Sequence, residues 1–254
     1  MIISEQELAL KAAKAEEKLL TAKSLAKSET ALSWFCEDFA LRFCWSSNAI
    51  EGNTLSLDET AALIEYDEVS SGHTYSEYRE AKKLYRAISE MLLPFCKSDI
   101  TADWIKRSNA LIMGGDGEYR KIPVKVGSLI ETVYVPPSAE KAPELMGEFI
   151  QSVNFGAESL LEAAKKAAVC HIEFERIHPF ADGNGRTGRM ILNKQLINLG
   201  FAPITLNKTG AYRRAFKIYG RNGDASLMAY EILSEEEAAL ERFLDFYEKA
   251  NPKI

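Results

Sequence analysis

Residues 178–189 read His-Pro-Phe-Ala-Asp-Gly-Asn-Gly-Arg-Thr-Gly-Arg, and they decide most of what the sequence predicts. Glycines allow consecutive backbone N–H groups to converge on an anion, and Arg186 and Arg189 can each bind a phosphate through two nitrogens. Asp182 can hold a divalent cation, and His178 can accept a proton near neutral pH. This combination predicts a site that handles a nucleoside triphosphate.

The flanking sequence places this stretch between two helices. Residues 158–177 are rich in Ala, Leu, Lys and Glu, and a second helix is expected to begin near Asn184 with its positive end toward the anion. The glycines also satisfy G-x-G-x-x-G, but a dinucleotide site needs a strand before that motif. No Gly-Lys-Ser/Thr run of a Walker A loop is present. A plain glycine-rich turn with solvated arginines remains an alternative, although a turn requires neither the histidine nor the aspartate.

The same twelve residues resemble the complete core motif of Fic-domain proteins, H-x-F-x-[D/E]-G-N-G-R-x-x-R. The resemblance implies that His178 is the general base that deprotonates a protein hydroxyl. It implies that Asp182 holds Mg²⁺, or Mn²⁺, between the α- and β-phosphates, and that Arg189 clamps the γ-phosphate. The residues that it assigns to nucleotide binding are Gly183, Asn184, Gly185, Arg186 and Arg189.

Members of this family usually transfer AMP from ATP to Ser, Thr or Tyr of a target protein and release pyrophosphate. The Doc-type branch, which transfers phosphate, carries Lys where this chain has Gly185. The resemblance therefore implies a protein adenylyltransferase with ATP as substrate and an unidentified target protein, and self-modification is the simplest first substrate to test. Two alternatives stay open: removal of AMP at the same site, and a non-catalytic nucleotide-binding regulatory module. The intact His178 argues against the module, since a pure binder has no use for a base.

Residues 47–53, Ser-Asn-Ala-Ile-Glu-Gly-Asn, resemble the inhibitory motif [S/T]-x-x-x-E-[G/N] of class II members of the family. The resemblance implies that Glu51 pairs with Arg189 and occupies the place of the γ-phosphate. Ser47 lies one helical turn before Glu51, where its hydroxyl could reach the carboxylate. Taken without the core motif, the same residues read as an ordinary helix C-terminus that ends at Gly52.

A hairpin is predicted within residues 117–137. Apolar and polar residues alternate from 121 to 126, Gly127 and Ser128 open a turn, and residues 133–135 return as a second strand. The hairpin resembles the Fic flap, which pairs with the backbone of a target protein; a purely structural edge hairpin is the alternative. The predicted docking residues are Lys121, Ile122, Pro123, Val124, Lys125, Val126 and Gly127.

The remaining helical patterns include residues 75–95, residues 226–250 and a helix capped by Ser56 with Glu59 at its third position. They predict an all-α (mainly α) fold, a Fic-type helical bundle with this one short β-hairpin flap. We expect an N-terminal helical extension over residues 1–40 and a Fic domain over 41–254, with the inhibitory helix at about 41–53. His171 and His73 are interpreted as structural, because no P-C-x-x-C follows the H-x-E at His171. The sequence leaves the oligomeric state open, so a homo-oligomer is neither predicted nor excluded.

Composition excludes several classes of function. The formal net charge of −6 argues against nucleic acid as a main partner. No run of 18 apolar residues predicts a membrane span, and the first residues lack the features of a secretion signal. The four cysteines share no C-x-x-C spacing, which favours reduced thiols and a cytoplasmic location.

Overall fold

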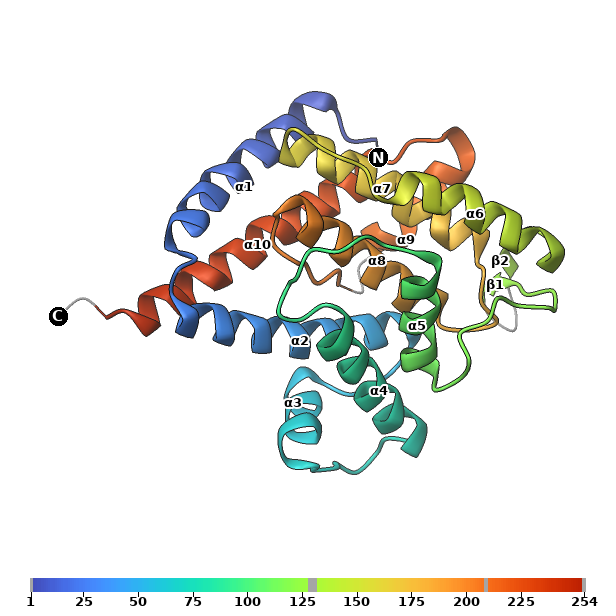
Figure 1. Cartoon of the computed structure of the whole chain (residues 1–254), viewed down its shortest axis with the longest axis horizontal. Coiled ribbons are helices and arrows are strands. Elements are labelled where there is room, and N and C mark those ends of the chain that lie inside the picture. The colour runs from blue at the N-terminus through green and yellow to red at the C-terminus, as the bar shows by residue number, and fades with distance from the viewer. Residues whose placement is uncertain (1, 128–131, 208–209, 253–254) are drawn as a thin grey trace.

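The computed structural model describes residues 2–127, 132–207 and 210–252 (Figure 1). Within them the chain is mainly helical with one short hairpin, so the predicted fold class is confirmed. The elements in chain order are α1 (Glu5–Leu25), α2 (Glu29–Glu51), α3 (Leu57–Tyr66), α4 (Tyr75–Met91), α5 (Ala102–Met113), β1 (Val126–Gly127), β2 (Thr132–Tyr134), η1 (Ala139–Lys141), α6 (Ala142–Val153), α7 (Leu160–Ile177), α8 (Asn184–Leu199), α9 (Gly210–Asn222) and α10 (Ser226–Ala250).

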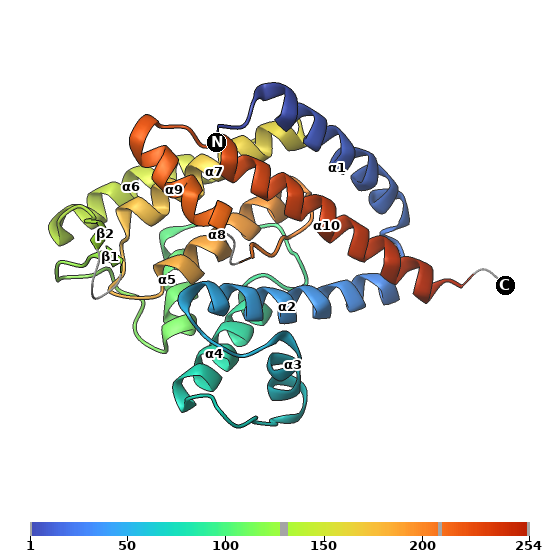
Figure 2. The ribbon, with the colours of Figure 1, turned by 180° about the vertical axis from the view of Figure 1, so that it is seen from behind.

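Helix α8 runs through the middle of the molecule, and the other long helices surround it (Figures 1 and 2). Its side chains enter three different apolar clusters. Leu192 and Leu196 pack with α1, α7 and α10, Met190 and Ile197 pack with α2 and α4, and Ile191 packs with α6 and α7. Residues 186–197 of α8 are all buried, as expected for a helix at the centre of a bundle. The first turn of α8 is therefore fixed in place by the whole core.

The ends of α2, α3 and α4 are set by local sequence signals. Gly52 ends α2 with φ of 108°, and its N–H donates to the carbonyl of Ala49. The predicted cap of α3 is confirmed, because Ser56 and Glu59 form a reciprocal capping box. Thr74 caps α4 in the same way.

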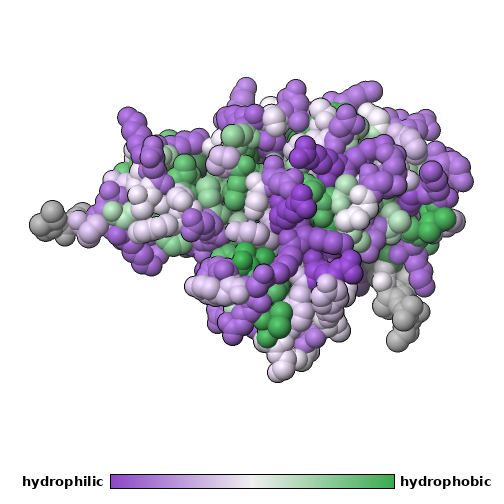
Figure 3. All heavy atoms as spheres, turned by 60° about the horizontal axis from the view of Figure 1, so that its bottom comes forward, coloured by the Kyte–Doolittle hydropathy of each residue, from purple (hydrophilic) through white to green (hydrophobic). Residues whose placement is uncertain are grey.

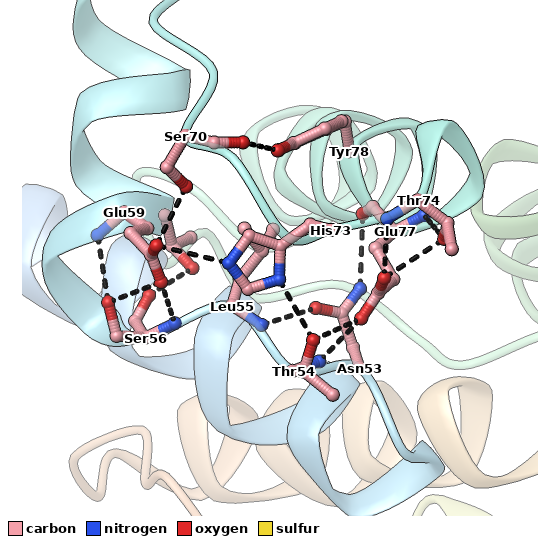
Figure 4. Close-up of polar contacts among 11 residues, drawn as sticks. Asn53, Thr54, Leu55, Ser56, Glu59, Ser70, His73, Thr74, Glu77 and Tyr78 are labelled. Carbon is pink, nitrogen blue, oxygen red and sulfur yellow. Dashed lines mark hydrogen bonds and ion pairs between the residues drawn. The ribbon is translucent and has the colours of Figure 1, made fainter.

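His73 joins the loop after α2 to the starts of α3 and α4 (Figure 4). Its Nδ1 lies 2.9 Å from the hydroxyl of Thr54, and its Nε2 lies 3.0 Å from a carboxylate oxygen of Glu59. Glu77 accepts hydrogen bonds from the backbone N–H and the hydroxyl of Thr54. Both ring nitrogens are thus used within the scaffold, which agrees with the structural interpretation of His73. These contacts also hold the chain that follows residues 47–53.

The N-terminal helix lies along α10 (Figure 2). Lys11 and Lys18 pair with Glu237 of α10 at 2.6 and 2.7 Å. Helix α2 continues without interruption past residue 40, so the proposed boundary between 1–40 and 41–254 falls inside a helix. The division into extension and Fic domain stays a prediction.

The hairpin is shorter than the alternation of residues 121–126 predicted. Val126 pairs with Tyr134 and Gly127 with Thr132, and residues 121–125 lie outside the strands. Two features keep that segment out of the ladder: Pro123 has no backbone N–H, and the carbonyl of Ile122 is taken by the side chain of Arg120. Gly127 belongs to β1 and not to the turn, and Ser128 lies outside the described residues.

No helix in the described part of the chain is long and apolar enough to cross a bilayer. One face of the molecule is shown in Figure 3, where polar residues predominate and apolar side chains surface in small separate patches.

Glu236 on α10 offers a test of core electrostatics. Its carboxylate is fully buried, Oε1 accepts a hydrogen bond from the N–H of Ala202, and Oε2 has no partner among the described residues. Burial raises its pKa from 4.5 to about 8. The folded protein therefore binds a proton that the unfolded chain releases between these values, so stability falls as pH rises from about 4.5 to 8.

We expect Glu236→Gln to remove this pH dependence. Gln keeps the acceptor for Ala202 and resembles the protonated acid, so the variant should unfold near the wild-type free energy at pH 4.5. At pH 7 it should be more stable by roughly 2–3 kcal/mol. Urea unfolding at the two pH values checks this, and a stability difference that does not change with pH would contradict it.

Candidate functional site

The bend between α7 and α8 carries the predicted core motif. Helix α7 ends at His178, which adopts the left-handed conformation with φ of 50° and ψ of 58°, and its N–H donates to the carbonyl of Phe174. Gly183, with φ of 77°, precedes α8, and no side chain caps that helix. The first N–H groups of a helix have no acceptor inside the helix. Those of Asn184 and Gly185 are thus available to an anion above the first turn.

The side chain of Asn184 shapes the loop. Its Oδ1 accepts from the N–H of Phe180 and its Nδ2 donates to the carbonyl of the same residue, both at 2.9 Å. Asn109 of α5 supports the loop from below by donating to the carbonyl of Asp182 and to the hydroxyl of Thr187. Because its amide is committed to the loop, we expect Asn184 to contribute its backbone N–H to a nucleotide.

Arg189 and Glu51 form an ion pair between α8 and the last residue of α2. Nη2 of Arg189 lies 2.6 Å from Oε1 of Glu51. The Arg189 side chain is 1% exposed, whereas that of Glu51 is 37% exposed. Burial alone would raise the pKa of Glu51, but the charge and hydrogen bond of Arg189 outweigh it and hold that pKa below its usual value. The glutamate is therefore ionised at neutral pH.

Ser47 contacts the arginine and not the glutamate. Nε of Arg189 donates to the Ser47 hydroxyl at 2.8 Å, and Nη2 donates to the Ser47 carbonyl at 2.9 Å. The expected hydrogen bond from Ser47 to Glu51 is not among the described contacts. A buried guanidinium needs acceptors for its five N–H groups, and the buried hydroxyl of Ser47 supplies one of them.

Gly185 leaves room for the ion pair. A Cβ atom at this position would lie 2.2 Å from Oε1 of Glu51 and 3.1 Å from Nη1 of Arg189. Any side chain here would push the carboxylate away from the guanidinium. The Glu51 carboxylate thus sits directly over the first turn of α8, where the free N–H groups converge.

Arg186 carries a buried charge that lacks a full set of partners. The residue is 5% exposed, its Nε has no hydrogen-bond partner among the described residues, and Nη2 lies 3.4 Å from the sulfur of Met113. The nearest carboxylate oxygen, of Asp182, is 3.7 Å away. Burying an unsatisfied guanidinium is costly, so this arrangement suits a site that is completed by an anion.

His178 is set up as a neutral base. Its Nδ1 lies 3.2 Å from the carbonyl of Glu175, and because a carbonyl only accepts, Nδ1 carries the proton and Nε2 is left unprotonated. Burial lowers the pKa of His178, and the positive charge of Arg120 lowers it further. The imidazole is therefore neutral at pH 7, with Nε2 able to accept a proton.

Asp182 is the acidic residue of the motif loop between α7 and α8. Its side chain is 72% exposed, and Oδ1 accepts from the N–H of Gly183 at 2.6 Å. No group of three or more His, Cys, Asp or Glu side chains in the described ranges could hold a metal by itself. Mg²⁺ commonly binds through one carboxylate together with substrate phosphates and water, and an exposed carboxylate beside an anion site fits that pattern.

Two residues beside Arg189, Tyr212 and Glu175, were not among the site residues predicted from the sequence. Tyr212 of α9 is buried, and its hydroxyl accepts from Nη1 of Arg189 and lies 2.9 Å from Nε2 of His171. Burial lowers the pKa of His171 to about 3, in keeping with a neutral structural role. Glu175 is half-buried near Arg189, with Oε1 buried and without a partner among the described residues, and burial raises its pKa to about 8. Their positions in helical patterns gave no signal, because helix periodicity does not distinguish an apolar neighbour from a buried ionic one.

Comparison with known proteins agrees with this geometry. The sequence profile of the Fic/DOC family matches residues 99–196. The protein adenylyltransferase fic-1 of Caenorhabditis elegans is 28% identical over 234 residues, which are 89% of this chain and 45% of that protein. The protein adenylyltransferase Fic of Aedes aegypti is 30% identical over 73% of this chain and 38% of its own length. The chain thus spans less than half the length of these curated relatives.

Solved structures share the whole fold. A Fic family protein from Desulfovibrio desulfuricans G20 superposes with a TM-score of 0.78 at 25% identity, covering 96% of this chain and 76% of that one. A Fic domain-containing signaling protein from Bacteroides thetaiotaomicron superposes with a TM-score of 0.76 at 23% identity, covering 95% and 98%. Together with the core motif at the bend between α7 and α8, these matches establish that the chain has a Fic domain and belongs to the Fic/DOC family.

Proposed function

We propose that this protein is an autoinhibited protein adenylyltransferase. It transfers AMP from ATP to a Ser, Thr or Tyr hydroxyl of a target protein or of itself. The observation that carries the proposal is the ion pair between the buried Arg189 and the partly exposed Glu51 over the uncapped start of α8. The names of the curated relatives support the same reaction.

In the proposed reaction the phosphates of ATP lie over the first turn of α8. The N–H groups of that turn and the guanidinium groups of Arg186 and Arg189 bind the phosphate oxygens. Asp182 would hold Mg²⁺, which neutralises phosphate charge when it is bound. Nε2 of His178 takes the proton of the acceptor hydroxyl while its oxygen bonds to the α-phosphorus, and the bond from that phosphorus to pyrophosphate breaks. Positioning of the reactants and neutralisation of phosphate charge account for most of the rate acceleration.

Inhibition follows from competition for one guanidinium. The γ-phosphate and the Glu51 carboxylate are both anions that need Nη2 of Arg189. While Glu51 occupies Arg189, the triphosphate binds without its γ-phosphate anchor, and the α-phosphorus is not aligned for attack. The glycine at 185 admits this carboxylate, whereas the lysine of phosphate-transferring relatives would displace it.

The flap supplies the proposed docking edge for the target. Ile122 and Val135 are 60% and 67% exposed on its two arms, so apolar side chains of a bound segment can pack there. Pairing through backbone N–H and carbonyl groups makes recognition tolerant of the target sequence.

The position of the transferred group tests the reaction. Glu51→Gly protein is incubated with Mg²⁺ and with ATP labelled on either the α- or the γ-phosphate, and labelled protein is counted. We expect label to appear only from α-labelled ATP, with an added AMP by intact mass. If label appears from γ-labelled ATP, the protein transfers phosphate and not AMP. If label appears from neither form of ATP, the protein is not a transferase and the proposal is wrong.

Arg186→Met tests the anion site without touching the base. The variant removes a buried, incompletely paired charge, so we expect its melting temperature to be no lower than that of the wild type. Its Kd for ATP should rise about 10- to 100-fold, since a hydrogen bond to a charged group contributes about 1.5–3 kcal/mol. Calorimetric titration measures the Kd. Unchanged affinity would place the phosphates elsewhere.

A further inference from the structure

Arg120 is a buried arginine with no nearby counter-charge. It precedes the flap and is 4% exposed. No carboxylate among the described residues lies within ion-pair distance of it. The negative charge that acts on its pKa is that of the exposed Glu140. A buried unpaired charge needs an explanation. Its contacts supply one.

The guanidinium of Arg120 donates to three carbonyl groups from three segments. Nε donates to the carbonyl of His178 at 2.8 Å, Nη1 to that of Ile122 at 3.3 Å, and Nη2 to that of Pro137. The backbone N–H of Arg120 also donates to the carbonyl of Pro179 at 2.8 Å. Ile122 lies on the way into the hairpin and Pro137 on the way out. One side chain therefore joins both arms of the flap to the core motif.

The hydrogen bond from Arg120 to the His178 carbonyl fixes a residue with a left-handed backbone conformation. A non-glycine residue in the left-handed region is uncommon and is held there by its surroundings. Arg120 holds the carbonyl on one side of this residue, and Phe174 holds its N–H on the other. The direction of the imidazole follows from this backbone conformation.

We propose that Arg120 is a positioning residue that holds the base His178 and the docking edge of the flap as one unit. The proposal rests on the proposed function for the roles of His178 and the flap. An acceptor hydroxyl presented by a target on the flap then meets Nε2 at a fixed distance, because the same guanidinium holds both partners. The positive charge of Arg120 also contributes to the lowered pKa of the imidazole.

The first test reads His178 directly and needs no activity. The chain has three histidines, so their ring signals can be followed by NMR against pH and assigned with single variants. In Arg120→Met we expect the midpoint of His178 to move to higher pH, while the ring signals of His73, far from the flap, stay unchanged. Arg120→Lys keeps the charge and should leave the His178 midpoint closer to the wild type.

The second test separates docking from chemistry in the Glu51→Gly background, with one target protein found by labelling. Arg120→Met should raise the KM for that target and lower kcat, whereas the KM for ATP stays within about twofold, because Arg120 contacts no phosphate-binding residue. Arg120→Lys should recover part of kcat. Arg176→Met is the matched control: the Arg176 side chain lies 5.2 Å from the ring of Tyr134 in the flap and 5.9 Å from the ring of Tyr219, and among the described residues it makes no hydrogen bond to the motif loop.

A folded Arg120→Met protein with an unchanged His178 midpoint and an unchanged KM for the target would overturn the proposal. If the methionine variant does not fold, Arg120→Gln carries the same comparison as a neutral side chain that still donates a hydrogen bond. Failure of the proposed function gives a different result, since no variant would transfer AMP while the NMR comparison would still report on the contact between Arg120 and His178.

Discussion

Glu51→Gly is expected to raise the rate of AMP transfer about 100-fold over that of the unsubstituted protein. Losing the Glu51 carboxylate as a hydrogen-bond partner of the buried Arg189 guanidinium changes the free energy by about 3 kcal/mol, and each 1.4 kcal/mol is about a factor of ten. In the wild type this energy holds Glu51 on Arg189. In the variant the guanidinium keeps Ser47 and Tyr212 as partners and is free to bind the γ-phosphate. Intact mass and labelled AMP measure the rate.

Glu51→Gln is the matched control for charge. It keeps the length of the side chain and one oxygen, but it does not compete with an anion as a carboxylate does, so its rate should fall between those of the wild type and the glycine variant. Without nucleotide the glycine variant should be less stable than the wild type, and ATP should stabilise it more strongly. A glycine variant that binds ATP but transfers AMP no faster than the wild type would contradict the inhibitory role of Glu51.

His178→Asn should lower the transfer rate of the Glu51→Gly protein by about 100- to 10,000-fold, the usual contribution of a positioned base. Asparagine is the suitable replacement because it tolerates the left-handed conformation that residue 178 adopts, with φ of 50°. Alanine at this position would add about 1 kcal/mol of backbone strain and confuse chemistry with folding. The Kd for ATP should change by less than about threefold, since His178 is assigned to the hydroxyl and not to the phosphates. Single-turnover rates with calorimetric titration check both.

The pH dependence provides a second check on the base. The pKa of His178 lies below its usual value because of burial and the charge of Arg120. The neutral form is the active one, so the rate should rise with pH through that lowered pKa and be level at pH 7 and above. His178→Asn should lose this rise. A rise centred above pH 7, or one that persists in the asparagine variant, would assign the proton acceptor to another group.

Local patterns in the sequence predicted the helices well where caps and periodicity act together. Helix α10 begins and ends at the predicted residues 226 and 250, and the box of Ser56 and Glu59 starts α3 as expected. The helix expected over 75–95 ends earlier, at Met91. The residue before a proline is biased away from helical geometry. Pro94 therefore makes the helix end before residue 93.

Contacts between distant residues were predictable only where a motif linked them. The pairing of Glu51 with Arg189 was expected from two motifs 138 residues apart and is present in the structure. The roles of Tyr212 and Arg120 depend on how α9 and the flap pack against the loop, which no local pattern encodes. The alternation of residues 121–126 was misleading for the same reason. The side chain of Arg120 donates to the carbonyl of Ile122, which would otherwise be available for pairing with a second strand.

The position of Glu51 at the very end of α2 determines how fast the inhibition can respond. The helix stops at Gly52, and the following loop is fixed by His73 and Glu77, so the backbone need not move for the carboxylate to leave. A rotation of a partly exposed side chain takes picoseconds to nanoseconds. In the proposed inhibition, Glu51 would act as a tethered competitor with a high effective concentration, in rapid equilibrium with the γ-phosphate. The transfer rate would then increase gradually with any change that weakens the contact between Glu51 and Arg189, and no slow conformational change would be needed.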